Sequence, residues 1–256
     1  MIDVAIEYPF LFLKLKAKGS VPASWAEVNE AQFIAISRTI NGAEADFRFL
    51  SILTGVKERL LKKLSSYALL KLSQQIDFVG KAGNYHDSFI IKNIQVFRMI
   101  YSAPNTKLEG LTFGQFIFCD SYYNDWVSTK KDIALNNFVA SLYRHAGEMF
   151  DNKDIPYRSW KIKNVDMDIR MAITFNWSLV MAWLGKAYPL IFREPTEKEP
   201  TTESETTAGA KQSPWIKLFE SLVGDDLINR DKYAELPVHT VFRHLTKKYK
   251  ENAQRK

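Results

Sequence analysis

Cysteine and histidine are both scarce in this chain of 256 residues, which has one cysteine and four histidines. The lone Cys119 excludes an intrachain disulfide and a thiolate metal cluster, and it fits a reducing compartment. His239 and His244 are five residues apart, which on a helix separates them by about 140°, so they do not share a metal as an i, i+4 pair would. We therefore expect no metal and no cofactor.

An uninterrupted apolar run of membrane-span length is also missing. The most hydrophobic stretch, Met171 to Phe192, contains Asn176, Lys186 and Pro189, and without them it is shorter than the ~20 residues a bilayer requires. The N-terminal segment has acids and an early proline where an export signal has basic and then apolar residues. These patterns predict a central core helix, no membrane span and a cytoplasmic protein.

Sequence motifs of the common enzyme classes are absent as well. The glycines of GKAGNYHDS at 80–88 lack Walker spacing, and there is no GxSxG or HExxH. His86 beside Asp87 is interpreted as a turn pair, and Asp166 and Asp168 as acids that complement a helix dipole. Cys119 lies in the apolar sequence FIFCDSYY, which raises the pKa of a thiol. The chain is expected not to be an enzyme.

What the chain does contain is apolar material in helical rhythm, with 46% hydrophobic and 13% aromatic residues. Ser24 and Glu27 fit a capping box that opens an amphipathic helix, and Gly55 ends the helix that follows. Residues 57–79 continue the helical pattern. Alternation in residues 12–18 predicts a short strand, whereas period alone does not distinguish strand from helix at 88–96.

The second half of the sequence repeats these helix signals. Thr112 and Gln115 form a second capping box, and the apolar positions from Leu135 to Ala146 follow the helical period. Pro156 interrupts the pattern, and residues 165–185 form the long core helix. We predict a mainly α fold, a multi-helix globular domain with a short N-terminal strand or hairpin.

Residues 194–213 divide the chain, because hydrophobic residues almost vanish there and Glu, Thr, Ser and Pro replace them. The predicted organisation is a helical core domain at 1–193, an acidic linker at 194–213 and a C-terminal helical segment with a basic tail at 214–256, which forms a tethered helical pair. The apolar stripes of that pair are the candidate protein-binding residues: Trp215, Leu218, Phe219, Leu222, Phe242 and Tyr249.

Positive charge is concentrated at the C-terminus, where residues 243–256 hold six Lys or Arg against one Glu, in a chain of net charge +6. This tail supports an alternative function as a DNA-associated accessory protein. Tyr122, Tyr123 and Trp126 near Lys130 offer base stacking, but aromatics at helical spacing are typical of a core. Nucleic acid is therefore not the expected partner.

Four sequence stretches carry a family likeness: PASWAE at 22–27 followed by Gln32-Phe33, LSILTGV at 50–56, LTFGQFI at 111–117 and FVASLYR at 138–144. This arrangement resembles small helical proteins of tailed bacteriophages, particularly those of Bacteroidetes-type hosts, which are discussed as tail assembly chaperone-like factors. The resemblance spans about Val21 to Phe192 and brings no catalytic residue. It implies a cytoplasmic protein, in the host cell if phage-encoded, that binds an aggregation-prone partner such as a tape-measure protein.

Overall fold

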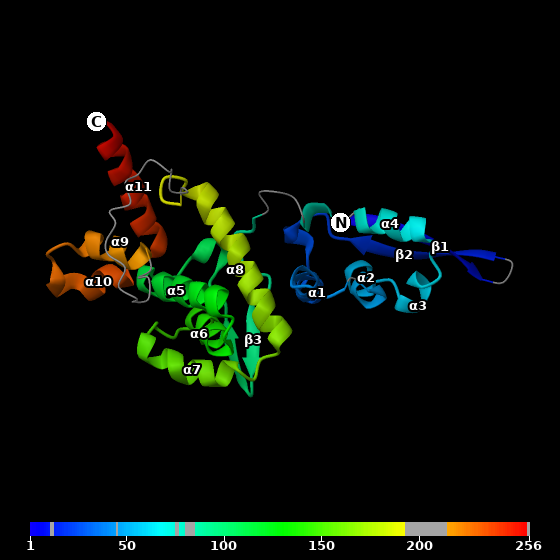
Figure 1. The fold of residues 1–256 in the computed structure, drawn as a ribbon, viewed down its shortest axis with the longest axis horizontal. Helices are drawn as coiled ribbons and strands as arrows, with labels where there is room; N and C mark the ends of the chain where they lie inside the picture. Colours follow the sequence, from blue (N-terminus) through cyan, green and yellow to red (C-terminus); the bar gives the residue numbers. More distant parts are fainter. Residues whose placement is uncertain (11–12, 45, 75–76, 80–84, 193–213, 255–256) are drawn as a thin grey trace. The chain divides into compact units, whose positions relative to one another are not determined.

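The computed structural model describes residues 1–10, 13–44, 46–74, 77–79, 85–192 and 214–254. As predicted, the chain is mainly helical and begins with an antiparallel hairpin (Figure 1). The strands are β1 (Ile2–Phe10), β2 (Leu13–Val21), β3 (Asn93–Val96) and β4 (Met99–Ser102). The α-helices are α1 (Glu30–Ile40), α2 (Phe47–Thr54), α3 (Glu58–Leu61), α4 (Ser66–Gln74), α5 (Phe113–Thr129), α6 (Asp132–Leu142), α7 (Ile155–Ile162), α8 (Met167–Ala187), α9 (Pro214–Val223), α10 (Arg230–Glu235) and α11 (Val238–Gln254). Short 3₁₀ helices are η1 (Trp25–Glu27), η2 (Asp77–Val79), η3 (Thr106–Leu108), η4 (Asn152–Asp154) and η5 (Leu227–Asn229).

The chain divides into two compact units, and each is discontinuous in sequence. Unit 1 comprises Met1–Ile91 and Asp166–Ala182, and unit 2 comprises Lys92–Val165 and Trp183–Lys256. This grouping differs from the predicted division into 1–193 and 214–256, because the C-terminal helices pack on α5 and belong with unit 2. The predicted linker at 194–213 lies outside the described residues.

The N-terminal hairpin of unit 1 packs its second strand against the end of α2. Strands β1 and β2 pair along their whole length, from Ile2 opposite Val21 to Phe10 opposite Leu13. A Cβ atom at Gly19 would lie 2.5 Å from the Thr54 carbonyl oxygen. Only glycine allows the hairpin to approach the helix so closely.

The first long helix begins later than the predicted capping box. Ser24 makes no side-chain cap, and residues 25–27 form only η1. The capping box is instead made by Asn29 and Gln32, whose side chains exchange hydrogen bonds with each other's backbone N–H at 3.0 and 3.1 Å. Glu27 accepts a hydrogen bond from the Ala23 backbone N–H instead, so its carboxylate is not available to the helix start.

The described part of the predicted helical stretch 57–79 contains three separate helices, α3, α4 and η2. The break between α3 and α4 occurs because the Ser65 hydroxyl accepts a hydrogen bond from the Ala68 N–H and so starts a new helix. The predicted helix end at Gly55 is confirmed, since this residue adopts the left-handed conformation after α2.

An aromatic cluster forms the centre of unit 1. Trp25 packs edge-on against Phe33, Phe78 and Phe175, with ring centroids 5.2 to 5.8 Å apart. Helix α8, the predicted long core helix, contributes Phe175 and also the buried Asn176. The Asn176 side chain accepts from the Ile90 N–H and donates to the Ser88 carbonyl, so it fixes the segment before β3.

Unit 2 is built around α5 and α6. Thr112 caps α5 as predicted by accepting from the Gln115 N–H. The reciprocal half of that capping box is wrong, because the Gln115 side chain donates to the Ser141 carbonyl at 2.8 Å and ties α5 to α6. Within the ambiguous segment 88–96, the last residues, Asn93–Val96, form strand β3, which pairs with β4.

Two further boundaries in unit 2 differ from the prediction. Helix α6 ends at Leu142 and leaves Ala146 in a turn, because the segment from Tyr143 leaves the helical conformation and Arg144 pairs with Ser102 as an isolated β-bridge. Pro156 does not interrupt a helix. It occupies the first turn of α7, where its missing N–H has no helical partner to lose.

The C-terminal helices are anchored at the start of α5. The Phe113 N–H donates to the Leu236 carbonyl, and the Val238 N–H donates to the Leu111 carbonyl. A Cβ atom at Gly114 would lie 3.1 Å from both the Cβ and the carbonyl oxygen of Ala234, so α10 rests directly on α5. The sequence predicted α9 and α11 but not this short helix between them.

Candidate functional site

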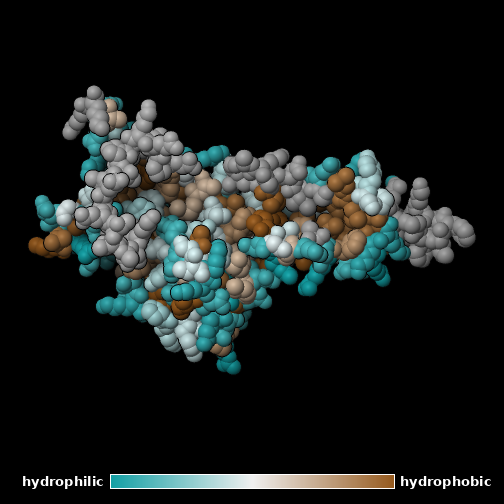
Figure 2. Space-filling model, viewed as in Figure 1, coloured by the Kyte–Doolittle hydropathy of each residue, from teal (hydrophilic) through white to brown (hydrophobic). Residues whose placement is uncertain are grey.

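An open apolar groove of about 590 Å³ lies among α1, α2, α4 and η2 of unit 1. Eight of its lining side chains are hydrophobic: Ile36, Ile40, Phe47, Phe49, Leu50, Leu69, Leu70 and Val79. Ile40 is 48% exposed and Leu70 is 57% exposed. Figure 2 shows hydrophobic surface interspersed with hydrophilic surface over these helices. Large apolar side chains held open to solvent are typical of a binding surface.

The polar residues at the groove are engaged in local structure. Asp46 caps α2 by accepting from the Phe49 N–H at 2.7 Å, and the Thr39 hydroxyl donates to the Ala35 carbonyl. Asp46 is also the only titratable residue among the described lining residues. Since eight of the described lining residues are hydrophobic, what the groove itself offers is burial of apolar surface.

Basic residues dominate the helices that form one side of this groove. Residues 47–74 hold six Lys or Arg and one Glu. Glu58 pairs with Lys62 at 2.6 Å on the surface of α3, and Lys71 lies over the Tyr67 ring of α4 at 4.8 Å. These basic residues lie outside the described lining of the groove, whose one charged residue is Asp46, so they give the surrounding helices, and not the groove itself, a net positive charge.

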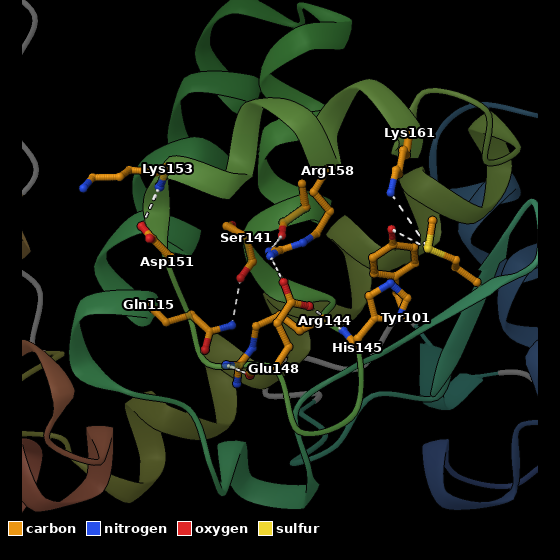
Figure 3. Close-up of polar contacts among 12 residues, drawn as sticks. Tyr101, Gln115, Ser141, Arg144, His145, Glu148, Asp151, Lys153, Arg158 and Lys161 are labelled. Carbon is orange, nitrogen blue, oxygen red and sulfur yellow. Dashed lines mark hydrogen bonds and ion pairs between the residues drawn. The ribbon is translucent and has the colours of Figure 1, made fainter.

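In unit 2, an ion pair between Arg158 of α7 and Glu148 joins this helix to the segment that follows α6 (Figure 3). The Arg158 side chain is 3% exposed, and it donates to Glu148 Oε1 at 2.5 Å and to the Ala140 carbonyl at 2.8 Å. Glu148 also accepts from the His145 N–H, and Arg144 donates to the Glu148 carbonyl. Figure 3 shows these groups converging between α6 and α7, so their hydrogen bonds join the two helices.

The predicted protein-binding residues of the C-terminal helices divide by exposure. Trp215, Phe219 and Phe242 are buried. Leu218 and Leu222 are half-buried, and Tyr249 is 38% exposed. The three buried side chains form part of the core of unit 2 rather than an open surface, because they cover the hydrophobic side of α5.

Aromatic contacts show how α9 and α11 cover α5. The Phe242 ring packs edge-on against Phe113 and Phe116, with centroids 6.1 and 5.3 Å apart, and Trp215 packs against Phe116 at 5.0 Å. Burial raises the pKa of Asp120 to about 6, although hydrogen bonds from the side chains of Trp215 and Asn124 oppose this rise. The predicted binding stripe is thus used within the chain.

The residues weighed as catalytic in the sequence are engaged separately. Asp166 accepts from the Asp168 N–H at the start of α8, which confirms the helix N-terminal role, and Asp168 pairs with Arg38 at 3.1 Å. His86 contacts the Ser88 hydroxyl at 3.0 Å, and burial lowers its pKa. None of these side chains lines the groove. Burial raises the pKa of the Cys119 thiol to about 12, as its apolar sequence predicted.

His239 lies in a separate cavity of unit 2, of about 610 Å³, together with Trp183 and Tyr188. Its Nδ1 is 2.7 Å from the Tyr188 hydroxyl, and its Nε2 contacts the Lys107 carbonyl oxygen. Both ring nitrogens are therefore used in hydrogen bonds. His244 is exposed on α11, so the two histidines do not share a ligand.

The cluster of tyrosine and tryptophan residues on α5 lies mainly in the core of unit 2. Trp126 is buried with Lys130 over its ring at 4.2 Å, and Tyr123 packs on Phe138 at 5.5 Å. In the described part of the chain, no three His, Cys, Asp or Glu residues are grouped to hold a metal ion. The helices that the structure describes also include none with the length and apolar character to cross a membrane.

Comparison with known proteins does not identify a family for this chain. No family model, curated protein or solved structure matches the chain. The site is therefore assigned from its own residues.

Sequence reasoning missed the groove because it treated α1, α2 and α4 only as packing helices. A signal was present in α4, where Leu72 is buried but Leu70, two positions earlier, is exposed. Residues two apart on a helix point in different directions. An α-helix with leucine on both faces has more apolar surface than one core contact uses.

Proposed function

We propose that this protein is a non-enzymatic tail assembly chaperone or adaptor that binds an apolar helical segment of a partner such as a tape-measure protein. The observation that carries the proposal is the open groove of unit 1, lined by eight hydrophobic side chains. The resemblance of the chain to phage tail assembly factors supports the same role. An amphipathic helix that lies in such a groove buries its own apolar face and is protected from aggregation.

The proposal specifies the partner's chemistry as well as its shape. Hydrophobic residues spaced i, i+3, i+4 and i+7 suit contact with Ile40, Leu50 and Leu70 along the groove. Because residues 47–74 carry a net charge of +5, acidic residues beside that apolar face favour binding and speed association. The occupant is therefore an acidic amphipathic helix from another protein.

The test is binding of the full chain to a fluorescein-labelled amphipathic peptide of about 18 residues, with Leu on one face and Glu on the other. Leu70→Glu places a charge in the groove and is expected to weaken binding at least about tenfold. Leu227→Glu is the matched control, since Leu227 is also an exposed leucine, at 71% against 57% for Leu70, and lies in unit 2. Unchanged binding in Leu70→Glu, or equal loss in both variants, would contradict the proposal.

Co-expression tests the chaperone role itself. The wild-type chain is expected to raise the soluble yield of the tail proteins encoded beside its gene and to co-purify with one of them, whereas Leu70→Glu does neither. A tail protein that is equally soluble with and without the chain counts against this role. If the chain binds the peptide but has no effect on tail proteins, its role is that of an adaptor for a different partner.

The basic C-terminal tail supports one alternative, a DNA-associated accessory protein. Arg243, Lys247, Lys248 and Lys250 are all exposed on α11. Duplex DNA binding through this helix weakens steeply with salt, because each phosphate contact releases counterions. Lys247→Ala combined with Lys248→Ala should then reduce the affinity and the salt slope, and duplex binding unaffected by this change rules the alternative out.

A further inference from the structure

Helix α7 of unit 2 presents two large aromatic side chains to solvent. Tyr157 is 63% exposed and Trp160 is 55% exposed, while the other described side chains of the same helix include five that are buried: Ile155, Arg158, Ser159, Lys161 and Ile162. The Tyr157 and Trp160 rings have centroids 6.4 Å apart and planes within 12° of each other. Their i, i+3 spacing places both on the face opposite the core.

A lysine flanks each of these aromatic rings. The Lys161 ammonium lies 4.2 Å from the centroid of the Tyr157 ring, and the Lys163 ammonium lies 5.4 Å from that of Trp160. The two aromatic faces are thus set among cations. Asp154 at the N-terminal end of α7 is the acidic residue nearest to them in sequence.

The turn of the β3–β4 hairpin extends the same chemistry. The Lys161 ammonium is 3.9 Å from the Met99 sulfur, which places α7 beside β4, and Figure 3 shows Lys161 pointing toward the Tyr101 side of that strand. Phe97 in the turn is 64% exposed with φ of +55°, and Arg98 follows it. Glycine is the favoured residue at such a position, so an exposed phenylalanine here has a conformational cost.

We propose that the surface formed by Phe97, Arg98, Tyr157, Trp160 and Lys163 binds single-stranded nucleic acid by base stacking and phosphate contact. Proteins that bind single strands without sequence preference combine aromatic side chains with positive charge in this way. Residues 92–101 and 155–163 together hold five Lys or Arg and no Asp or Glu. Arg158 and Lys161 are buried, which leaves Lys92, Arg98 and Lys163 as the exposed cations. This site is in unit 2 and is independent of the proposed groove in unit 1.

The ring geometry favours a nucleic acid over an anionic lipid surface. Parallel rings such as Tyr157 and Trp160 present the same orientation to successive bases. Binding to an anionic membrane uses positive charge too, but it also requires a large continuous apolar face, and α7 exposes only two aromatic rings among its described residues. No local sequence pattern predicted this surface, because its residues come from two separate segments, and the contact between Lys161 and Met99 exists only in the fold.

The experiment measures fluorescence anisotropy of labelled oligothymidylate of about 20 nucleotides with the full chain, at several salt concentrations. Trp160→Ala is expected to weaken binding about tenfold, since one base–aromatic stack is lost, whereas Trp160→Phe retains most of it. Lys163→Ala should reduce the salt slope by about 0.7, the value for one phosphate contact on a single strand.

Two further variants separate binding from folding. Phe97→Gly suits the positive φ of the turn, so it is expected to weaken oligothymidylate binding without lowering the melting temperature. Tyr67→Ala is the matched control, because Tyr67 is an exposed aromatic ring with a lysine over it in unit 1. This control should bind as the wild type does.

Three results would overturn the inference: no oligothymidylate binding by the wild type, binding unaffected by Trp160→Ala, or equal loss in Tyr67→Ala. Wild-type binding to vesicles of mixed neutral and anionic phospholipid, with no binding to oligothymidylate, assigns the surface to a membrane and also overturns it. Loss of peptide binding by the groove leaves this site untouched.

Discussion

Unit 1 and unit 2 solve the same packing problem differently. In unit 2 the hydrophobic side of α5 is covered by α9 and α11, whose Trp215 and Phe242 bury themselves against Phe116. In unit 1, α1, α2 and α4 leave a groove with Leu70 exposed at its edge. The comparison teaches that an amphipathic stripe marks a surface to be covered, and that only the tertiary structure shows whether the chain itself covers it.

The two units also differ in how exposed their ion pairs are. Unit 2 contains a buried pair between Arg158 and Glu148, whereas the pair between Arg38 and Asp168 in unit 1 is largely exposed. A buried pair is costly to break because it leaves an uncompensated charge, and an exposed pair contributes little. Unit 2 is therefore expected to be the more sensitive to single substitutions.

The largest expected effect comes from Phe242→Ala. Removing this fully buried ring from the contact between α11 and α5 should destabilise the protein by about 3 to 5 kcal/mol in denaturant unfolding. Tyr249→Ala on the same helix should change the unfolding free energy by less than about 0.5 kcal/mol. Equal, small effects would mean that α11 is not part of the core of unit 2.

Glu148→Gln should have the next largest effect. It leaves the buried Arg158 guanidinium without its charged partner, which should cost about 3 kcal/mol of unfolding free energy. The matching change in unit 1, Asp168→Asn, should cost less than about 1 kcal/mol because that pair is exposed. A larger loss in Asp168→Asn than in Glu148→Gln would reverse the comparison.

A smaller effect depends on pH through Asp120. Because burial raises the folded-state pKa from the ordinary 3.8 to about 6, the folded protein holds a proton that the unfolded chain has lost between these values. Stability should therefore fall as pH rises from about 4 to about 6, by about 2 kcal/mol, and stay lower above that range.

Asp120→Asn isolates this contribution, because the amide oxygen still accepts hydrogen bonds but carries no charge. The variant should be more stable than the wild type at pH 7 and similar to it near pH 4, as measured by urea unfolding at each pH. A constant difference between the two proteins across this range would show that Asp120 does not titrate in the fold.

Much of the fold follows from local sequence. The helix end at Gly55 and the cap at Thr112 are confirmed, because left-handed glycines and side-chain caps depend on neighbouring residues only. The predicted capping box at Ser24 was wrong, because a local pattern can fit more than one position. Asn29 lies five residues later with Gln32 at the required spacing, and the sequence does not say which of two plausible caps is used.

The candidate sites were much harder to predict. Phe242 and Leu70 are both hydrophobic residues on amphipathic helices, and the sequence predicted the first as a binding residue and assigned no site to the second. The structure buries the first and exposes the second. Their exposure depends on which other helix lies against them, and that contact is made by residues far away in the chain.

The amino-acid sequence by itself determined that this chain is mainly helical, that α2 ends at Gly55 and that Thr112 caps α5, and that Cys119 is buried. Those properties depend on local hydrogen bonds, on the helical period and on apolar neighbours. Only the tertiary structure decided that the C-terminal helices complete unit 2, that a groove stays open in unit 1, and that α7 contacts β4 through Lys161 and Met99. Burial and proximity are properties of packing between distant segments, which no local pattern specifies.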